Sequence, residues 1–167
     1  MNSYVDLLLQ RHRRNGILLD ANLLLLLFIG SFRPELIGVH KRLNVFRVKD
    51  YELLIALTRQ VRRIFTTPNI LTQVSDLSTG PLGLSGELAR DYFGLFASQL
   101  SVLHELYITS VDAAADPGFH KFGLTDSVIA VLARTSTLVL TIDLPLSSFL
   151  QNRGFDALNF TNLRDWQ

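Results

Sequence analysis

Cysteine is absent from this sequence of 167 residues, so disulfide bonds and thiolate metal ligands are excluded. Cysteine chemistry therefore does not indicate the compartment of the protein. An excess of charge of one sign is also absent, because the formal net charge at pH 7 is +1. That balance argues against massive nonspecific binding of nucleic acid, although it does not exclude a local basic groove.

Long apolar runs are also lacking. The leucine-rich segment 17–32 contains Asp20, Asn22 and Gly30, whereas a membrane-spanning helix needs about 20 apolar residues. A signal peptide is not expected either, because the polar stretch before this segment carries the basic cluster 11–14 and no small-residue cleavage site follows. We therefore expect no membrane association and a cytoplasmic location.

The residues that are present fit one globular domain. Apolar residues make up 48% and charged residues 19%, which is ordinary for a soluble protein long enough to bury a sizeable core. No repeat, low-complexity tract or linker divides the chain. We therefore predict a single domain over residues 1–167.

Short apolar segments alternate with helical patterns along the chain. Strands are predicted over residues 17–19, 64–67, 138–142 and 155–160, and helices over 23–29, 51–61, 68–77, 87–104, 124–134 and 146–152. Residues 2–15 are interpreted as a polar approach to the first strand, and 78–86 as a loop. Because several strands are continuous apolar runs, the alternation predicts an α/β fold with three layers, in which helices cover both faces of a mostly parallel central sheet.

One carboxylate lies within the most apolar part of the sequence. Asp20 falls between the predicted strand 17–19 and the predicted helix 23–29, with Asn22 two positions later. In an open α/β sheet this position is the carboxyl end of a strand, where ligands bind. A buried carboxylate without a partner would cost several kcal/mol. The simpler alternative is that Asp20 only caps the helix.

Further polar residues occupy comparable positions. Asp143 follows the strand 138–142, Asp126 lies in the first turn of a helix, and Gln73 lies on the helix that follows the strand 64–67. If the strands are parallel neighbours, these residues converge at one edge of the sheet, where three carboxylates repel each other unless a cation lies between them. Oxygen ligands without cysteine favour Mg²⁺ or Mn²⁺, which can promote phosphodiester hydrolysis. Taken separately, Asp126 and Asp143 are also plausible helix caps.

In this order and context, four segments of the chain resemble the PIN-domain ribonucleases, a family that includes the VapC-type toxins of bacterial toxin–antitoxin pairs. The resemblance covers roughly residues 16–160 and rests on the order of short motifs. It implies a metal-dependent endonuclease that acts on RNA, with an antitoxin protein as a partner and a homodimer as the assembly. The four segments are Ile17-Leu-Leu-Asp20-Ala-Asn22, Thr67-Pro-Asn-Ile-Leu-Thr-Gln73-Val-Ser-Asp76-Leu, Gly123-Leu-Thr-Asp126-Ser-Val-Ile-Ala and Leu140-Thr141-Ile-Asp143-Leu-Pro-Leu. The tail Gly154-Phe-Asp-Ala-Leu-Asn159-Phe160 is similar to the last strand of the family.

The resemblance also implies roles for individual residues. Asp20, Asp126 and Asp143 correspond to the first, third and fourth acids that hold one or two Mg²⁺ or Mn²⁺ ions. Thr141 matches a small hydroxyl residue that holds a ligand or water, and Asn22 is expected to support Asp20.

The second acidic position of the family departs from its pattern, because Gln73 stands where the family usually has Glu. Gln offers a neutral carbonyl oxygen but no charge, so both metal affinity and metal-assisted catalysis are expected to weaken. Asp76, about one helical turn further on, could substitute, although we expect it to face solvent.

Basic residues near the predicted cleft are candidates for contacts with RNA phosphates, namely Arg33, His120 and Lys121. The clusters at residues 11–14 and 59–63 are interpreted as solvated surface, with a phosphate-facing role for the first as the alternative.

Two functional hypotheses follow from these residues. The first is an active, Mg²⁺- or Mn²⁺-dependent ribonuclease. The second is a catalytically impaired module that binds RNA or a protein, which Gln73 motivates. A phosphohydrolase of the haloacid-dehalogenase type is disfavoured because its chemistry needs a second Asp where this chain has Asn22.

Overall fold

A five-stranded sheet forms the centre of the protein in a computed structural model that describes residues 3–79 and 83–166. All strand pairs are parallel, and the strand order is β3-β2-β1-β4-β5. The strands are β1 (Ile17–Leu19), β2 (Ile64–Thr66), β3 (His104–Glu105), β4 (Leu138–Thr141) and β5 (Ala157–Asn159). The predicted α/β class with a parallel sheet is therefore confirmed.

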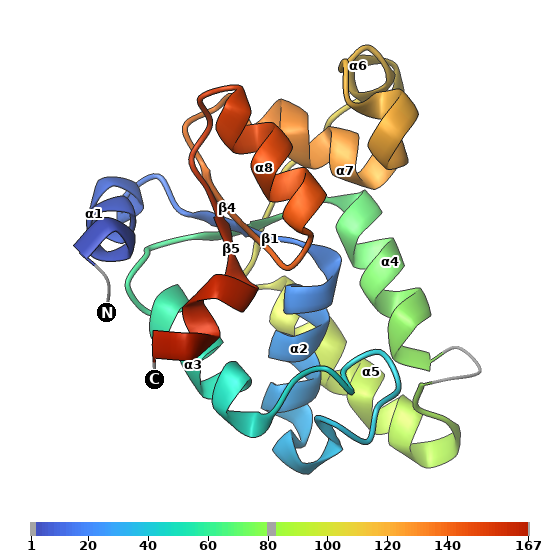
Figure 1. The fold of residues 1–167 in the computed structure, drawn as a ribbon. Helices are drawn as coiled ribbons and strands as arrows, with labels where there is room; N and C mark the ends of the chain where they lie inside the picture. Colours follow the sequence, from blue (N-terminus) through green and yellow to red (C-terminus); the bar gives the residue numbers. More distant parts are fainter. Residues whose placement is uncertain (1–2, 80–82, 167) are drawn as a thin grey trace.

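Helices cover both faces of this sheet, as Figure 1 shows. On one side lie α2 (Ala21–Phe32), α3 (Val48–Thr58) and α5 (Gly86–Leu100), and on the other lie α6 (Ser110–Ala114), α7 (Phe119–Ala133) and α8 (Leu144–Asn152). The helix α4 (Pro68–Thr79) contacts both α2 and α7. The remaining elements are α1 (Ser3–His12) and the short 3-10 helices η1 (Pro34–Leu36) and η2 (Phe160–Trp166). The three predicted layers are present.

The hydrophobic core is centred on β1 and α2. All residues of β1 are fully buried, and α2 buries its residues from Leu23 to Gly30. A helix that is apolar on all sides is stable in water only when its whole circumference is covered, as α3, α4, α5 and the sheet cover α2. Of the helices in the described residues, none combines the length and apolar character needed to cross a membrane.

The structure contradicts the expectation that residues 2–15 are only a polar approach. Residues 3–12 form the helix α1, which buries Val5, Leu8, Leu9 and His12. These residues follow the i, i+3, i+4, i+7 spacing of an amphipathic helix. The polar character of this segment belongs to the solvent-facing side of α1 rather than to an irregular segment.

Several helix boundaries also differ from the predictions. The helix expected over 51–61 begins at Val48, and Asp50 lies in its first turn, where its carboxylate accepts a hydrogen bond from the backbone of Arg47 at 2.7 Å. The helix expected over 87–104 ends at Leu100. His104 then starts β3, an edge strand too short to leave a recognisable pattern in the sequence. The loop predicted over 78–86 includes residues 80–82, which lie outside the described residues.

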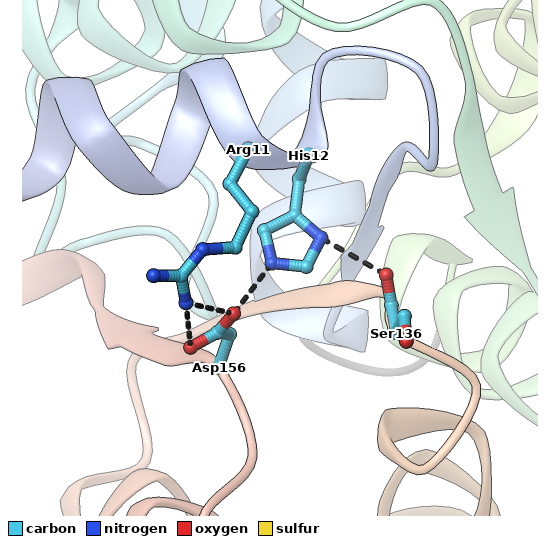
Figure 2. Close-up of polar contacts among 4 residues, drawn as sticks. All are labelled: Arg11, His12, Ser136 and Asp156. Carbon is cyan, nitrogen blue, oxygen red and sulfur yellow. Dashed lines mark hydrogen bonds and ion pairs between the residues drawn. The ribbon is translucent and has the colours of Figure 1, made fainter.

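Figure 2 shows the polar contacts that fasten α1 to the sheet. The His12 side chain is 2% exposed, with Nε2 2.7 Å from Asp156 Oδ2 and Nδ1 2.9 Å from the Ser136 carbonyl oxygen. Both partners are acceptors, so the two hydrogen bonds form together only when both ring nitrogens carry a proton. Burial raises the pKa of Asp156, but the hydrogen bonds from His12 and Arg11 outweigh burial and hold this pKa below its ordinary value.

We expect Asp156→Asn to lower the free energy of unfolding at neutral pH by about 1–3 kcal/mol, because the buried His12 loses its charged partner. The loss is measured as a lower melting temperature by circular dichroism. A depressed folded-state pKa means that Asp156 stabilises the fold above its unfolded pKa, near 3.8, and that this stabilisation disappears as the pH falls through the folded pKa. The exposed Asp91→Asn is the matched control, and equal melting temperatures for both variants would contradict the prediction.

Candidate active site at the carboxyl edge of the sheet

Two aspartates lie at the carboxyl ends of the adjacent strands β1 and β4. Leu19 pairs with Leu140 in the parallel register, and Asp20 and Asp143 follow the two strands as the N-caps of α2 and α8. From β1 the chain builds β2 and β3 on one side and then crosses to β4 on the other. The space between β1 and β4 is therefore the topological switch point of the sheet, the place where open α/β sheets bind ligands.

Asp20 acts as a helix cap and also as a link between strands. Its side chain is buried, with Oδ1 accepting from the backbone N–H of Leu23 at 2.8 Å. Oδ2 accepts from the hydroxyl of Thr141 at 2.5 Å and from the backbone N–H of Ile142 at 3.0 Å. Burial raises the pKa of Asp20, and these hydrogen bonds oppose that effect without cancelling it. The capping interpretation is thus correct but incomplete.

Thr141 positions both carboxylates at this edge. Its fully buried hydroxyl donates to Asp20 and accepts from the backbone N–H of Asp143 at 2.9 Å. Asp143 in turn uses Oδ1 to accept from the backbone N–H of Leu146 at 2.7 Å. The sequence suggested that Thr141 would hold a ligand or water, whereas in the structure it bonds the carboxylate of Asp20 directly.

The third acid, Asp126, reaches the same edge from α7. This helix is interrupted by Gly123, whose φ of 78° is the left-handed conformation that glycine tolerates best, so Asp126 lies in the first turn after the break. The side chain is half-buried and has no hydrogen-bond partner among the described residues. Burial, followed by the negative charges of Asp143 and Asp20, raises the pKa of Asp126 to about 6. The charges of Asp20 and Asp143 act on Asp126 from the N-caps of α2 and α8 at the same edge of the sheet.

These acids suit a hard cation in their chemistry. In the described part of the chain, no three His, Asp or Glu side chains are grouped closely enough to hold a metal ion by themselves. Mg²⁺ commonly keeps several waters and binds through one or two carboxylates, so a complete protein cage is not required. The oxygens of Asp126 and Oδ2 of Asp143 accept no hydrogen bond from the described residues, whereas both oxygens of Asp20 accept at least one. Metal binding stays a prediction.

The supporting residues on α2 and α4 take different places. Asn22 acts on Asp20 through a backbone hydrogen bond, which lowers the pKa of Asp20, rather than through its side-chain amide. Gln73 and Asp76 are both exposed on α4, and the solvent-facing position expected for Asp76 is the one observed.

The basic residues predicted near the cleft divide into two groups. Arg33 caps the C-terminus of α2, while Asp20 caps its N-terminus, so about 18 Å of helix separates them. The expectation that Arg33 lies beside the acids is therefore wrong. His120 and Lys121 precede Gly123 on α7, exposed and within two turns of Asp126. They remain candidates for phosphate contacts.

Sequence reasoning missed two polar residues at this edge. Asn159, at the end of β5, is buried and donates from Nδ2 to the carbonyl of Ile142 at 3.3 Å, which supports the backbone next to Asp143. Thr66, at the end of β2, has a buried hydroxyl without a partner among the described residues. Both are polar residues that end apolar strands, the same signal that identified Asp20.

Comparisons with known proteins do not decide between the functional hypotheses. No family model matches the chain, and searches of curated proteins and of solved structures find no match. The interpretation of this edge therefore depends on its geometry.

We expect Asp126→Asn to raise the free energy of unfolding at pH 7 by about 1–2 kcal/mol. The pKa of Asp126 is about 6 in the folded state and 3.8 in the unfolded state, so the wild type loses stability as the pH rises through this range. Partial exposure of the side chain reduces the loss. Urea unfolding at a series of pH values measures this difference, which should vanish at about pH 3 and below, where the carboxyl is largely protonated in both states. Asp91→Asn is again the control, and an Asp126→Asn variant without added stability at pH 7 would contradict the raised pKa of Asp126.

Proposed function

We propose that this protein is a metal-dependent endoribonuclease that hydrolyses RNA phosphodiester bonds at the carboxyl edge of β1 and β4. The observation that carries the proposal is the convergence of Asp20, Asp126 and Asp143 at the switch point of the sheet. A like-charged cluster that destabilises the fold is typical of functional sites, where stability is sacrificed to chemistry. The choice of RNA as substrate, and of an antitoxin and a second copy of the chain as partners, rests on the PIN-domain resemblance.

Each residue has a distinct task in this proposal. Asp126 and Asp143 would hold Mg²⁺ or Mn²⁺ with the oxygens that are not used in hydrogen bonds, and Asp20 adds negative charge beside them. A bound ion of this kind neutralises charge on the scissile phosphate and activates water. Thr141 keeps the carboxylates in fixed positions, so little reorganisation is needed when the substrate binds.

Substrate contacts are assigned to the first segment of α7. Lys121 is exposed on the turn before Gly123, with its Nζ 4.9 Å from the centre of the Phe122 ring, and His120 precedes it. Cationic and imidazole groups near the acids can bind the phosphates on either side of the scissile bond, which offsets the repulsion between RNA and the carboxylates.

The second candidate is a module that binds RNA or protein without cleaving it. Gln73 favours this candidate, because a neutral amide on α4 adds no charge with which to hold a cation. The hydrogen bonds of Asp20 favour it as well, since both oxygens of this carboxylate are already occupied.

Cleavage of labelled single-stranded RNA by the purified chain should require Mg²⁺ or Mn²⁺ and stop in EDTA. We expect Asp143→Asn and Asp126→Asn to lower the rate at least about 100-fold, because losing a proposed metal ligand should cost at least as much as losing a residue that only supports a ligand. Asp91→Asn should cleave like the wild type, and circular dichroism confirms folding of each variant. If the folded wild type cleaves no RNA with either metal, the second candidate replaces the first.

Gln73→Glu is expected to strengthen metal binding by adding a carboxylate on α4. The measurement is the rise in melting temperature with increasing Mn²⁺, since a ligand that binds only the folded state stabilises it by about 2.7 kcal/mol at 100 times its dissociation constant. Gln73→Glu should reach a given rise in melting temperature at a lower Mn²⁺ concentration than the wild type. Asp76→Asn, on the same helix, should need the same Mn²⁺ concentration as the wild type. Identical Mn²⁺ dependence in wild type and Gln73→Glu would show that residue 73 lies outside the site.

A further inference from the structure

The structure joins two arginine clusters that lie far apart in the sequence. The backbone N–H of Arg62 donates to the carbonyl of Arg13 at 2.9 Å, and the N–H of Ile17 donates to the carbonyl of Arg63 at 3.0 Å. The turn after α1 and the segment after α3 therefore lie side by side at the amino ends of β1 and β2 (Figure 1). Asp20 and Asp143 follow the opposite, carboxyl ends of β1 and β4. We call this the amino-edge arginine surface, which comprises Arg13, Arg14, Arg59, Arg62 and Arg63.

The positive charge of this surface is not neutralised. All five side chains are exposed, and none forms an ion pair with a carboxylate of the described residues. Other arginines of the chain do form ion pairs. Arg11 pairs with Asp156 (Figure 2), and Arg134 and Arg153 pair with Asp116. In a protein with a net charge of +1, such a concentration of positive charge is a local feature that attracts polyanions.

Two clefts open on this surface, and each combines arginines from both clusters. The larger, about 420 Å³, is lined by Arg14 and Arg63 together with Phe65 and Tyr107, and the smaller, about 250 Å³, by Arg13 and Arg59. No Asp or Glu lines either cleft. The loop 13–15 therefore lies between two basic clefts.

The larger cleft adds an aromatic surface to the charge. Tyr107 is 76% exposed, an unusual position for a large ring, and follows the edge strand β3. Phe65 is half-buried beneath the cleft, where its ring packs against His104 with the ring centres 5.9 Å apart. Its volume of about 420 Å³ falls in the range of small-molecule sites.

We propose that the amino-edge arginine surface binds single-stranded nucleic acid, for which RNA is the probe below, with phosphates on the arginines and an unstacked base on Tyr107. Guanidinium groups bind phosphate oxygens in a bidentate manner, and aromatic rings stack on the bases of single strands. The bases of a duplex are stacked on each other, and an acidic protein has no bases. Neither ligand would therefore stack a base on Tyr107. This inference is independent of the proposed cleavage, because the larger cleft and the acids lie at different ends of α7. Thr135, which lines the cleft, follows the C-terminus of α7, whereas Asp126 lies in the first turn after the break at Gly123.

Binding is measured by fluorescence anisotropy of a labelled single-stranded RNA of about 12 nucleotides at about 50 mM salt. The full chain is used in EDTA, which prevents metal-dependent cleavage during the measurement. We expect saturable binding that Arg14→Ala/Arg63→Ala weakens at least about tenfold, with the salt slope reduced by about 1.4. Tyr107→Ala should weaken binding about tenfold, while Tyr107→Phe keeps it. The exposed pair Arg42→Ala/Arg90→Ala removes the same charge elsewhere and should change affinity less than about twofold.

Four results would overturn this proposal. The first is no saturable binding of RNA by the wild type, and the second is an equal loss of affinity in Arg14→Ala/Arg63→Ala and in the control Arg42→Ala/Arg90→Ala. The third is unchanged affinity in Tyr107→Ala, and the fourth is competition by duplex RNA or polyglutamate as strong as that by unlabelled single-stranded RNA. Circular dichroism confirms that each variant is folded. Asp91→Asn should bind like the wild type. Intact RNA binding together with a failed cleavage assay of the wild type would reject only the catalytic role of the acids.

Discussion

The hydrogen bond between Asp20 and Thr141 is the interaction on which the carboxyl edge of this protein depends. It joins β1 to β4 across the switch point, and the same carboxylate also caps α2. The same threonine hydroxyl accepts from the backbone of Asp143 and so sets the start of α8. A buried carboxylate is tolerated only when its hydrogen-bonding capacity is used, and here that requirement holds two strands and two helices in one arrangement.

The parallel sheet places the three acids and the amino-edge arginine surface at opposite edges. Each strand begins after a turn at the amino edge and ends before a helix at the carboxyl edge. Asp20, Asp126 and Asp143 gather at the carboxyl edge, whereas the amino-edge arginine surface gathers where the strands begin. The proposed RNA cleavage would use both edges, because anionic ligands that the acids repel can be retained by positive charge elsewhere on the surface.

Much of the fold could be predicted from local patterns. The apolar runs of β1 and β4 and the helix after Asp20 were recognisable because residue type alone commits such segments to the core. The helix α1 was not predicted because polar residues and the basic cluster 11–14 surround the amphipathic spacing of Val5, Leu8 and Leu9. The strand β3 was missed because His104 and Glu105 are exposed, so their pairing with β2 leaves no hydrophobic pattern.

The sequence by itself determined the chemistry of the candidate site: acids that end apolar strands, a neutral Gln73, and no cysteine. Only the tertiary structure decided which groups meet. Thr141 lies 121 positions after Asp20 in the sequence. Arg62 donates a hydrogen bond to Arg13, although β1, α2, η1 and α3 lie between the two residues in the sequence. Local propensity does not act over such sequence separations. The same holds for Arg33, which is near Asp20 in sequence but one helix length away in space. Strand order and helix direction, which depend on packing of the entire chain, set these relationships.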